Sequence, residues 1–173
     1  FAAAAREAHN QRTACTGNNE WYTPVVYIQA AREVMGGIDL DPASCFIAQK
    51  TVDADRHFSA EDDGLKQVWS GRVWLNPPYS QPEIEQFARK LVDEVSAGRV
   101  TQAICLTNSA TDTAWFHVLG ATATAICFPR GRIKFLTPSG VQGAPLMGQA
   151  FFYFGQHQGK FESVFSKFGL VLG

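Results

Sequence analysis

The chain has 173 residues, of which 46% are hydrophobic and 18% are charged, a composition typical of a folded globular domain and not of a disordered segment. The formal net charge of −1 excludes a generally basic nucleic-acid coat, so any contact with a polyanion must come from a local patch. No apolar run approaches the roughly 18 residues that a membrane-spanning helix needs.

The length fits one domain. We expect a flexible N-terminal segment over residues 1–20 and a single domain over 21–173, with recognition loops around 130–148. Cys15, Cys45, Cys105 and Cys127 are scattered, without a close cysteine pair and without histidines at ligand spacing. We therefore expect reduced thiols, and neither a zinc site nor a disulfide framework.

The first part of the domain is predicted to alternate helices with short strands. Thr23 before Pro24 is typical of a helix N-cap with proline in the first turn, and the glycine pair at 36–37 ends that helix. The predicted elements are a helix over 25–35, a strand over 38–41, a helix around 46–48, a short strand over 51–54 and a polar loop over 58–65.

The second part ends in strands that follow one another directly. Its predicted elements are a strand over 72–76, an amphipathic helix over 82–96, a buried strand over 100–106, a short helix over 112–119, strands over 124–128 and 149–154, and an apolar tail over 161–172 that forms a last strand or helix. Alternation followed by consecutive strands predicts an α/β fold. The sheet is mostly parallel, with helices on both faces and an antiparallel edge strand. In such sheets ligands bind at the carboxyl ends of the strands.

Residues 72–80 (RVWLNPPYS) carry the strongest chemical signal. An apolar strand ends in Asn76, followed by Pro77, Pro78 and Tyr79, and two prolines cannot continue a central strand. The stiff backbone presents an amide side chain and carbonyls without nearby N–H groups, beside a phenol ring. This set suits a flat aromatic ligand that carries an amino group. The plain structural alternative is a proline-terminated strand followed by a turn.

The strand over 38–41 also ends in polar chemistry at this edge. Asp41 can accept hydrogen bonds from ammonium or hydroxyl groups, while the small turn at Pro42 and Ala43 lets the backbone approach a ligand. There is no Gly-x-Gly series, so a dinucleotide loop has no support. Asp39 and Asp41 permit a phosphatase interpretation, but position 43 lacks the hydroxyl that it needs. Asp41 could otherwise be a turn or cap acid.

Three further stretches are weaker candidates. Asp63, within the Asp-Asp-Gly-Leu sequence at 62–65, could accept a hydrogen bond from the adenine amino group of a cofactor, or lie in a solvated loop. The plain structural interpretation of Trp21, Thr23 and Pro24 is a helix start with a core aromatic residue beside it. Residues 109–113 lie at the end of a buried strand, and we expect them to border the same ligand pocket at the carboxyl ends of the strands.

Basic residues gather between the late strands. Arg130, Arg132 and Lys134 form a local patch that suits DNA phosphates, although an ordinary solvated hairpin is the alternative. The Gly/Pro-rich loop over 139–148 follows this patch and is long for a compact domain, so it could reach a groove.

Taken in order, Trp-x-Thr-Pro, Asp-Pro-Ala-Ser, Asp-Asp-Gly-Leu, Trp and Asn-Pro-Pro-Tyr-Ser resemble the phage-type DNA N6-adenine methyltransferases, which are Dam-like. The resemblance runs from about residue 21 to 154. The stretches at 111–117 and 131–135 also look like parts of that family. One departure is that Asp-Pro-Ala-Ser stands where methyltransferases at large have a glycine-rich cofactor loop.

The resemblance implies a Rossmann-like methyltransferase fold and transfer of a methyl group from S-adenosyl-L-methionine to a flipped-out adenine in double-stranded DNA. It implies a phage or prophage enzyme in the host cytoplasm, without a metal or a membrane contact. The implied catalytic residues are Asn76, Pro77, Pro78 and Tyr79; the cofactor residues are Trp21, Thr23, Pro24, Asp41, Pro42, Ala43, Asp63 and Asn76; and the DNA-binding residues are Arg130, Arg132 and Lys134.

Three alternatives stay open. The same chemistry could act on another amine, namely an RNA base, cytosine N4 or a protein glutamine. The chain could also be a nucleic-acid-binding module that has lost methyl transfer, or a phosphatase.

Overall fold

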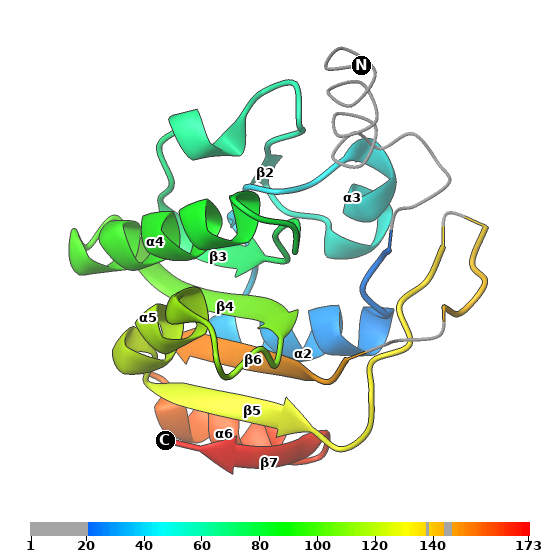
Figure 1. The fold of residues 1–173 in the computed structure, drawn as a ribbon, viewed down its shortest axis with the longest axis vertical. Coiled ribbons are helices and arrows are strands. Elements are labelled where there is room, and N and C mark those ends of the chain that lie inside the picture. The colour runs from blue at the N-terminus through cyan, green and yellow to red at the C-terminus, as the bar shows by residue number, and fades with distance from the viewer. Residues whose placement is uncertain (1–20, 138, 144–146) are drawn as a thin grey trace.

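The computed structural model describes residues 21–137, 139–143 and 147–173, and the expected N-terminal segment lies outside them. One seven-stranded sheet with the strand order β2-β1-β3-β4-β6-β5-β7 organises these residues (Figure 1). Its strands are β1 (Leu40–Asp41), β2 (Arg56–His57), β3 (Gly71–Leu75), β4 (Val100–Asn108), β5 (Ala125–Pro129), β6 (Gln149–Phe154) and β7 (Gly169–Leu172). The helices are α2 (Val25–Met35), α3 (Phe46–Val52), the 3₁₀ turn η1 (Gly64–Lys66), α4 (Glu83–Ser96), α5 (Ala114–Thr122) and α6 (Gln158–Phe165).

The sheet has a parallel half and an antiparallel half. β2, β1, β3 and β4 are mutually parallel, whereas β6 pairs antiparallel with both β4 and β5, and β7 pairs antiparallel with β5. The predicted α/β sheet and its antiparallel edge strand are confirmed, and β6 carries antiparallel pairing into the interior as well. Because β5 runs in the same direction as β4, the carboxyl ends of β1, β2, β3, β4 and β5 all lie at one edge, called the carboxyl edge below.

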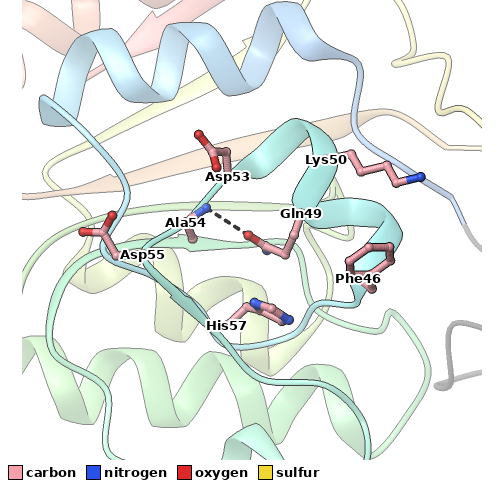
Figure 2. Close-up of a pocket in the computed structure, with 7 residues that line it drawn as sticks. All are labelled: Phe46, Gln49, Lys50, Asp53, Ala54, Asp55 and His57. Carbon is pink, nitrogen blue, oxygen red and sulfur yellow. Dashed lines mark hydrogen bonds between the residues drawn. The ribbon is translucent and has the colours of Figure 1, made fainter.

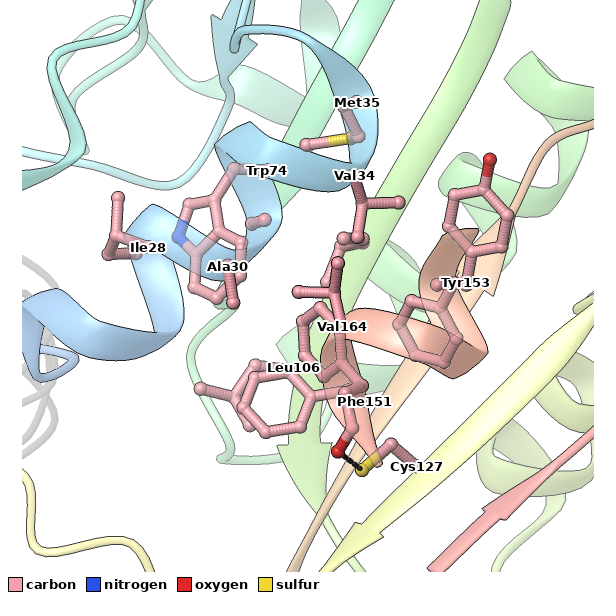
Figure 3. Packing of buried hydrophobic residues seen from close by; sticks show 14 of the residues in the cluster. Ile28, Ala30, Val34, Met35, Trp74, Leu106, Cys127, Phe151, Tyr153 and Val164 are labelled. Atoms are coloured by element: carbon pink, nitrogen blue, oxygen red, sulfur yellow. Dashed lines mark hydrogen bonds between the residues drawn. The ribbon is translucent and has the colours of Figure 1, made fainter. Parts of the chain in front are cut away.

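Helices cover both faces of the sheet, as predicted. α2 and α6 pack on one face, around Trp74, Phe151 and Tyr153, and Figure 3 shows side chains of these two helices meeting those of the strands. α4 and α5 pack on the opposite face, where the cluster includes Phe152 and Phe154. β6 contributes to both clusters, and all six of its residues are buried.

Two local predictions are wrong. Thr23 does not cap α2, because the helix begins at Val25 with Pro24 in the N-cap position and no side-chain cap bond. The strand expected over 51–54 is the end of α3, and the strand follows at β2. The β-branched pair Thr51-Val52 favours a strand locally, but the helix that starts after Cys45 continues until Asp53 takes a left-handed conformation (φ 49°).

The expectation of reduced thiols holds for two of the cysteines. Cys105 and Cys127 are buried and free, whereas Cys45 is disulfide-bonded, and Cys15 lies outside the described residues. The spacing of cysteines along the sequence does not predict which sulfur atoms the fold brings together. The prediction of a reduced thiol is therefore wrong for Cys45. Within the described ranges, no helix is long and apolar enough to cross a membrane.

Candidate active site

The carboxyl edge brings the two polar strand ends together. β3 pairs with β1 on one side, through Val73 and Leu40, and with β4 on the other, through Leu75 and Cys105. Asn76 therefore leaves the sheet between the end of β1, which carries Asp41, and the end of β4. The sequence prediction that these chemistries share one edge is confirmed.

Both ends of the Asn76 amide have hydrogen-bond partners. Its Nδ2 donates to the Thr23 hydroxyl oxygen at 3.4 Å, and its Oδ1 accepts from the Tyr79 hydroxyl at 2.8 Å. Thr23 is buried, so it holds the NH₂ end of the amide on the α2 side. The amide oxygen consequently points toward Tyr79.

Tyr79 is folded back against the sheet. Its ring packs beside the cluster on the α4 and α5 face, and its hydroxyl also lies 3.4 Å from the Leu106 carbonyl oxygen. Burial, with the nearby Cys105 thiol, raises the pKa of Tyr79 well above its usual value. The phenol is therefore a neutral donor at physiological pH, and its stacking on a base stays a prediction.

Asp41 is a buried acid held by neighbouring amides. Gln49 Nε2 donates to Asp41 Oδ2 at 2.9 Å and to the Ser44 hydroxyl at 2.7 Å, while the Ala43 N–H lies 3.4 Å from Oδ1. Burial raises the pKa of Asp41 to about 7, although the bonds from Ser44, Ala43 and Gln49 oppose the shift. Among the described residues Asp41 has no cationic partner.

Sequence reasoning missed Gln49. Its Oε1 accepts from the Ala54 N–H at 2.9 Å (Figure 2), so the side chain bridges the Asp41 turn to the chain after α3. Gln49 lines a surface depression of about 380 Å³ between α3 and β2. Figure 2 shows it there together with Phe46 and His57. A glutamine on a short helix gives no signal in a single sequence. Only the fold identifies it as a partner of Asp41.

The Asp-Asp-Gly-Leu stretch lies against the Asp-Pro-Ala-Ser turn. A Cβ added at Gly64 would clash with the Pro42 carbonyl oxygen, and the Trp69 indole N–H fixes the Gly64 carbonyl at 2.7 Å. Asp63 pairs with Lys66 at 2.8 Å, and Asp62 accepts from the Ser59 N–H at 2.8 Å. Contact between the two motifs is thus made by the glycine, and a cofactor role for Asp63 stays a prediction.

Asp39, one of the two acids of the phosphatase interpretation, serves a structural role. It forms an ion pair with Arg72, and the hydrogen bond from that guanidinium holds the pKa of Asp39 below its usual value. The Arg72 backbone N–H also donates to Asp39 Oδ2 at 2.7 Å. The pair ties the residue before β1 to the start of β3, away from the carboxyl edge.

The Trp-x-Thr-Pro motif is tied to the late part of the chain. Trp21 is half exposed, and its ring leaves room for no Cβ at Gly143. Tyr22 pairs with Leu136 through two backbone hydrogen bonds, of 2.7 and 2.9 Å. Thr23 therefore meets Asn76 in a segment that the residues after the basic patch hold in place.

The basic patch belongs to the same edge. Arg130 follows the carboxyl end of β5, and Arg132 and Lys134 alternate with the buried residues Ile133 and Phe135. All three cations are exposed, so the alternation presents them on the outside of an extended segment. Across the described ranges, no group of three or more His, Cys, Asp or Glu side chains could hold a metal ion.

The family model of DNA N-6-adenine-methyltransferase (Dam) matches residues 10–150. The chain belongs to this family. This confirms the resemblance that the motifs indicated. The Dam-family chain is also 33% identical over 98 residues to the DNA N-6-adenine-methyltransferase of Escherichia phage T1, a match that covers 56% of this chain and 38% of the phage protein. The matched stretch of the chain thus spans well under half the length of that relative.

Proposed function

We propose that the chain transfers a methyl group from S-adenosyl-L-methionine to the N6 atom of an adenine in double-stranded DNA, on a Rossmann-like methyltransferase fold. The observation that carries this proposal is the fixed Asn76 amide at the end of β3, one strand from the buried acid at the end of β1. Family membership supports the same reaction, and the strand order fits a ligand site at the carboxyl edge.

Asn76 and Pro77 would activate the target nitrogen. The N6 lone pair of adenine is delocalised into the ring and is a poor nucleophile, and hydrogen bonds accepted from its two N–H bonds localise that pair. Asn76 Oδ1 is oriented by Thr23, and the Pro77 carbonyl belongs to a proline-locked backbone. Acceptors that are aimed before the reaction need little reorganisation in the transition state.

The turn after β1 fits the amino-acid end of the cofactor. Asp41 is a buried carboxyl with no cation beside it among the described residues, and its hydrogen-bond donors Gln49, Ser44 and Ala43 are all uncharged. An ammonium group there would supply the missing charge. Asp41, Pro42 and Ala43 would hold the cofactor, with Gly64 keeping the turn in place. When bound, the cofactor supplies an electrophilic methyl group.

The target base must leave the duplex to reach Asn76, at a cost of a few kcal/mol. Arg130, Arg132 and Lys134 would hold the flanking phosphates, so binding should weaken as the salt concentration rises. Proton loss from the methylated nitrogen needs no strong base, because the alkylated ammonium is acidic and can release its proton to water.

The test is transfer of a labelled methyl group from S-adenosyl-L-methionine to unmethylated DNA, with RNA and protein as parallel substrates. We expect N6-methyladenine in DNA alone. Label in RNA, in cytosine or in protein would favour another amine, and label in none of them would contradict the proposal.

Asn76→Ala is the matching variant. Because it removes the acceptor and leaves the Asp41 turn intact, we expect it to lower turnover by at least about 100-fold. Binding of S-adenosyl-L-methionine by calorimetry should stay near that of the wild type. Activity close to the wild type would contradict the proposed role of Asn76.

A further inference from the structure

Gln149 is a buried polar residue at the start of an otherwise apolar strand. It is 4% exposed, and a buried amide is costly unless its polar atoms find partners. Its Oε1 accepts from the Ile133 N–H at 2.8 Å, and its Nε2 donates to the Met147 carbonyl at 2.7 Å. Both bonds go to the backbone of segments outside the sheet, so the side chain joins β6 to the residues after β5 and before β6.

These bonds hold the basic segment against the carboxyl edge. Gln149 itself pairs with Asn108 at the end of β4, and the next bond along is donated by the Ser109 N–H to the Gly148 carbonyl at 2.9 Å. At its other end the segment is fixed by the pairing of Leu136 with Tyr22. Arg132 and Lys134 are therefore carried on a strip of backbone that is anchored on both sides.

The two anchors differ in what they support. The Tyr22 anchor leads to Thr23 and hence to the Asn76 amide, whereas the Gln149 anchor acts directly between the two cations, at Ile133. Ile133 is buried and Arg132 and Lys134 are exposed, so the bond at Ile133 N sets which way the cations face. A side chain that only filled the core at this position would need no amide.

We propose that Gln149 is a positioning residue for DNA. It holds Arg132 and Lys134 where they meet phosphates beside the base that is delivered to Asn76. This inference rests on the proposed function, because it takes DNA as the substrate. It assigns to Gln149 an effect on DNA affinity and on its salt dependence, and none on the methyl-transfer step.

The experiment compares DNA binding by the wild type, Gln149→Met and Gln149→Asn over a series of salt concentrations. Methionine keeps the volume and loses both hydrogen bonds, while asparagine keeps an amide that is too short to reach both partners. We expect the KM for DNA to rise about five- to tenfold, with kcat within about twofold. The slope of log affinity against log salt should fall by about one to two, because each phosphate contact contributes about 0.9.

Gln102→Met is the matched control. Gln102 accepts from the Tyr153 hydroxyl at 3.0 Å near the opposite end of β4, so its loss also breaks a hydrogen bond of the sheet. We expect it to leave the salt slope unchanged. Arg132→Ala with Lys134→Ala gives the reference loss of slope, and adding Gln149→Met to that pair should lower the slope no further.

An unchanged salt slope in Gln149→Asn would overturn the inference, and so would an equal loss in Gln102→Met. Gln149→Asn decides the matter if Gln149→Met does not fold. A wild type that binds DNA with the expected slope but transfers no methyl group would sink the proposed function and leave the role of Gln149 standing. A wild type that does not bind DNA would overturn both.

Discussion

Asn76 and Tyr79 share a hydrogen bond at the amide oxygen that a target base would use. The Tyr79 hydroxyl donates to the same Asn76 oxygen that the adenine amino group needs. In Tyr79→Phe the competing donor is gone and the ring remains, so we expect kcat/KM equal to or above that of the wild type. Tyr79→Ala loses the ring, and steady-state kinetics should show kcat/KM about 5- to 150-fold lower, because base stacking on an aromatic ring contributes about 1–3 kcal/mol.

This pair of variants separates the two parts of the tyrosine. If Tyr79→Phe is as impaired as Tyr79→Ala, the hydroxyl is required in the reaction, and the bond to Asn76 is part of the competent state. Binding of S-adenosyl-L-methionine serves as the control in both variants, since neither change touches the Asp41 turn.

The raised pKa of Asp41 predicts that the stability of the fold depends on pH. Its pKa is about 7 in the folded chain against 3.8 for the ordinary carboxyl, so between these values the folded state holds a proton that the unfolded state has lost. The free energy of unfolding should therefore fall as the pH rises through this window, by up to about 1.4 kcal/mol per pH unit. An asparagine side chain does not titrate in this range, so Asp41→Asn should abolish this fall in the free energy of unfolding. Urea denaturation should show the variant more stable than the wild type at pH 8, and close to it near pH 4.

Asp112→Asn is the control, because Asp112 is exposed and the change should leave the difference between pH 4 and pH 8 unaltered. A wild type equally stable at both pH values would contradict the raised pKa. The same Asp41→Asn change should weaken cofactor binding. We therefore expect Asp41 to lower stability at neutral pH while contributing to cofactor binding.

At the scale of elements, η1 supports the turn after β1 through a single glycine. In Gly64→Ala the new methyl group meets the Pro42 carbonyl oxygen, and this backbone cannot move aside without shifting the turn. We expect cofactor affinity to fall at least about tenfold and stability to fall by about 1–3 kcal/mol, as overpacking of a closed site does. Calorimetric titration and urea denaturation measure the two effects.

Gly159→Ala is the matched control for this change. Gly159 lies in α6, and a Cβ there meets nothing within 4 Å, so alanine should stabilise the helix by up to about 1 kcal/mol. If Gly64→Ala binds the cofactor as well as Gly159→Ala does, the contact between the two motifs has no part in the site.

Local patterns predict elements when the pattern and the tertiary packing agree. The helix over 82–96 follows from its apolar face, and Ile84, Phe87, Ala88 and Leu91 are indeed buried in α4. Thr51-Val52 misleads because its β-branched side chains favour a strand, whereas the cap at Cys45 and the left-handed turn at Asp53 make it the end of a helix. Caps and turns of this kind depend on backbone angles that residue types only bias.

At the scale of the whole molecule, the sequence predicts at which edge of the sheet the site lies. It does not predict the side-chain hydrogen bonds within the site. Strand order places Asp41 and Asn76 at one edge, as their positions after apolar strands indicated. The bonds from Asn76 to Thr23 and from Ile133 to Gln149 join residues 53 and 16 positions apart. Residue periodicity does not predict such partners, because they depend on how the loops fold at the carboxyl edge.

β6 makes the two faces of the sheet one cooperative unit. Phe151 packs with Tyr27, Trp74 and Phe165 on the α2 and α6 face, while Phe152 packs with Phe116 on the other. We expect Phe151→Ala and Phe152→Ala each to lower the free energy of unfolding by about 3–5 kcal/mol, in a single transition. Leu172→Ala, on the exposed edge strand β7, should cost less than about 1 kcal/mol. Urea denaturation followed by circular dichroism and by tryptophan fluorescence provides the measurement. Two separate transitions in Phe151→Ala would contradict a single core, because loss on one face would then leave the other folded.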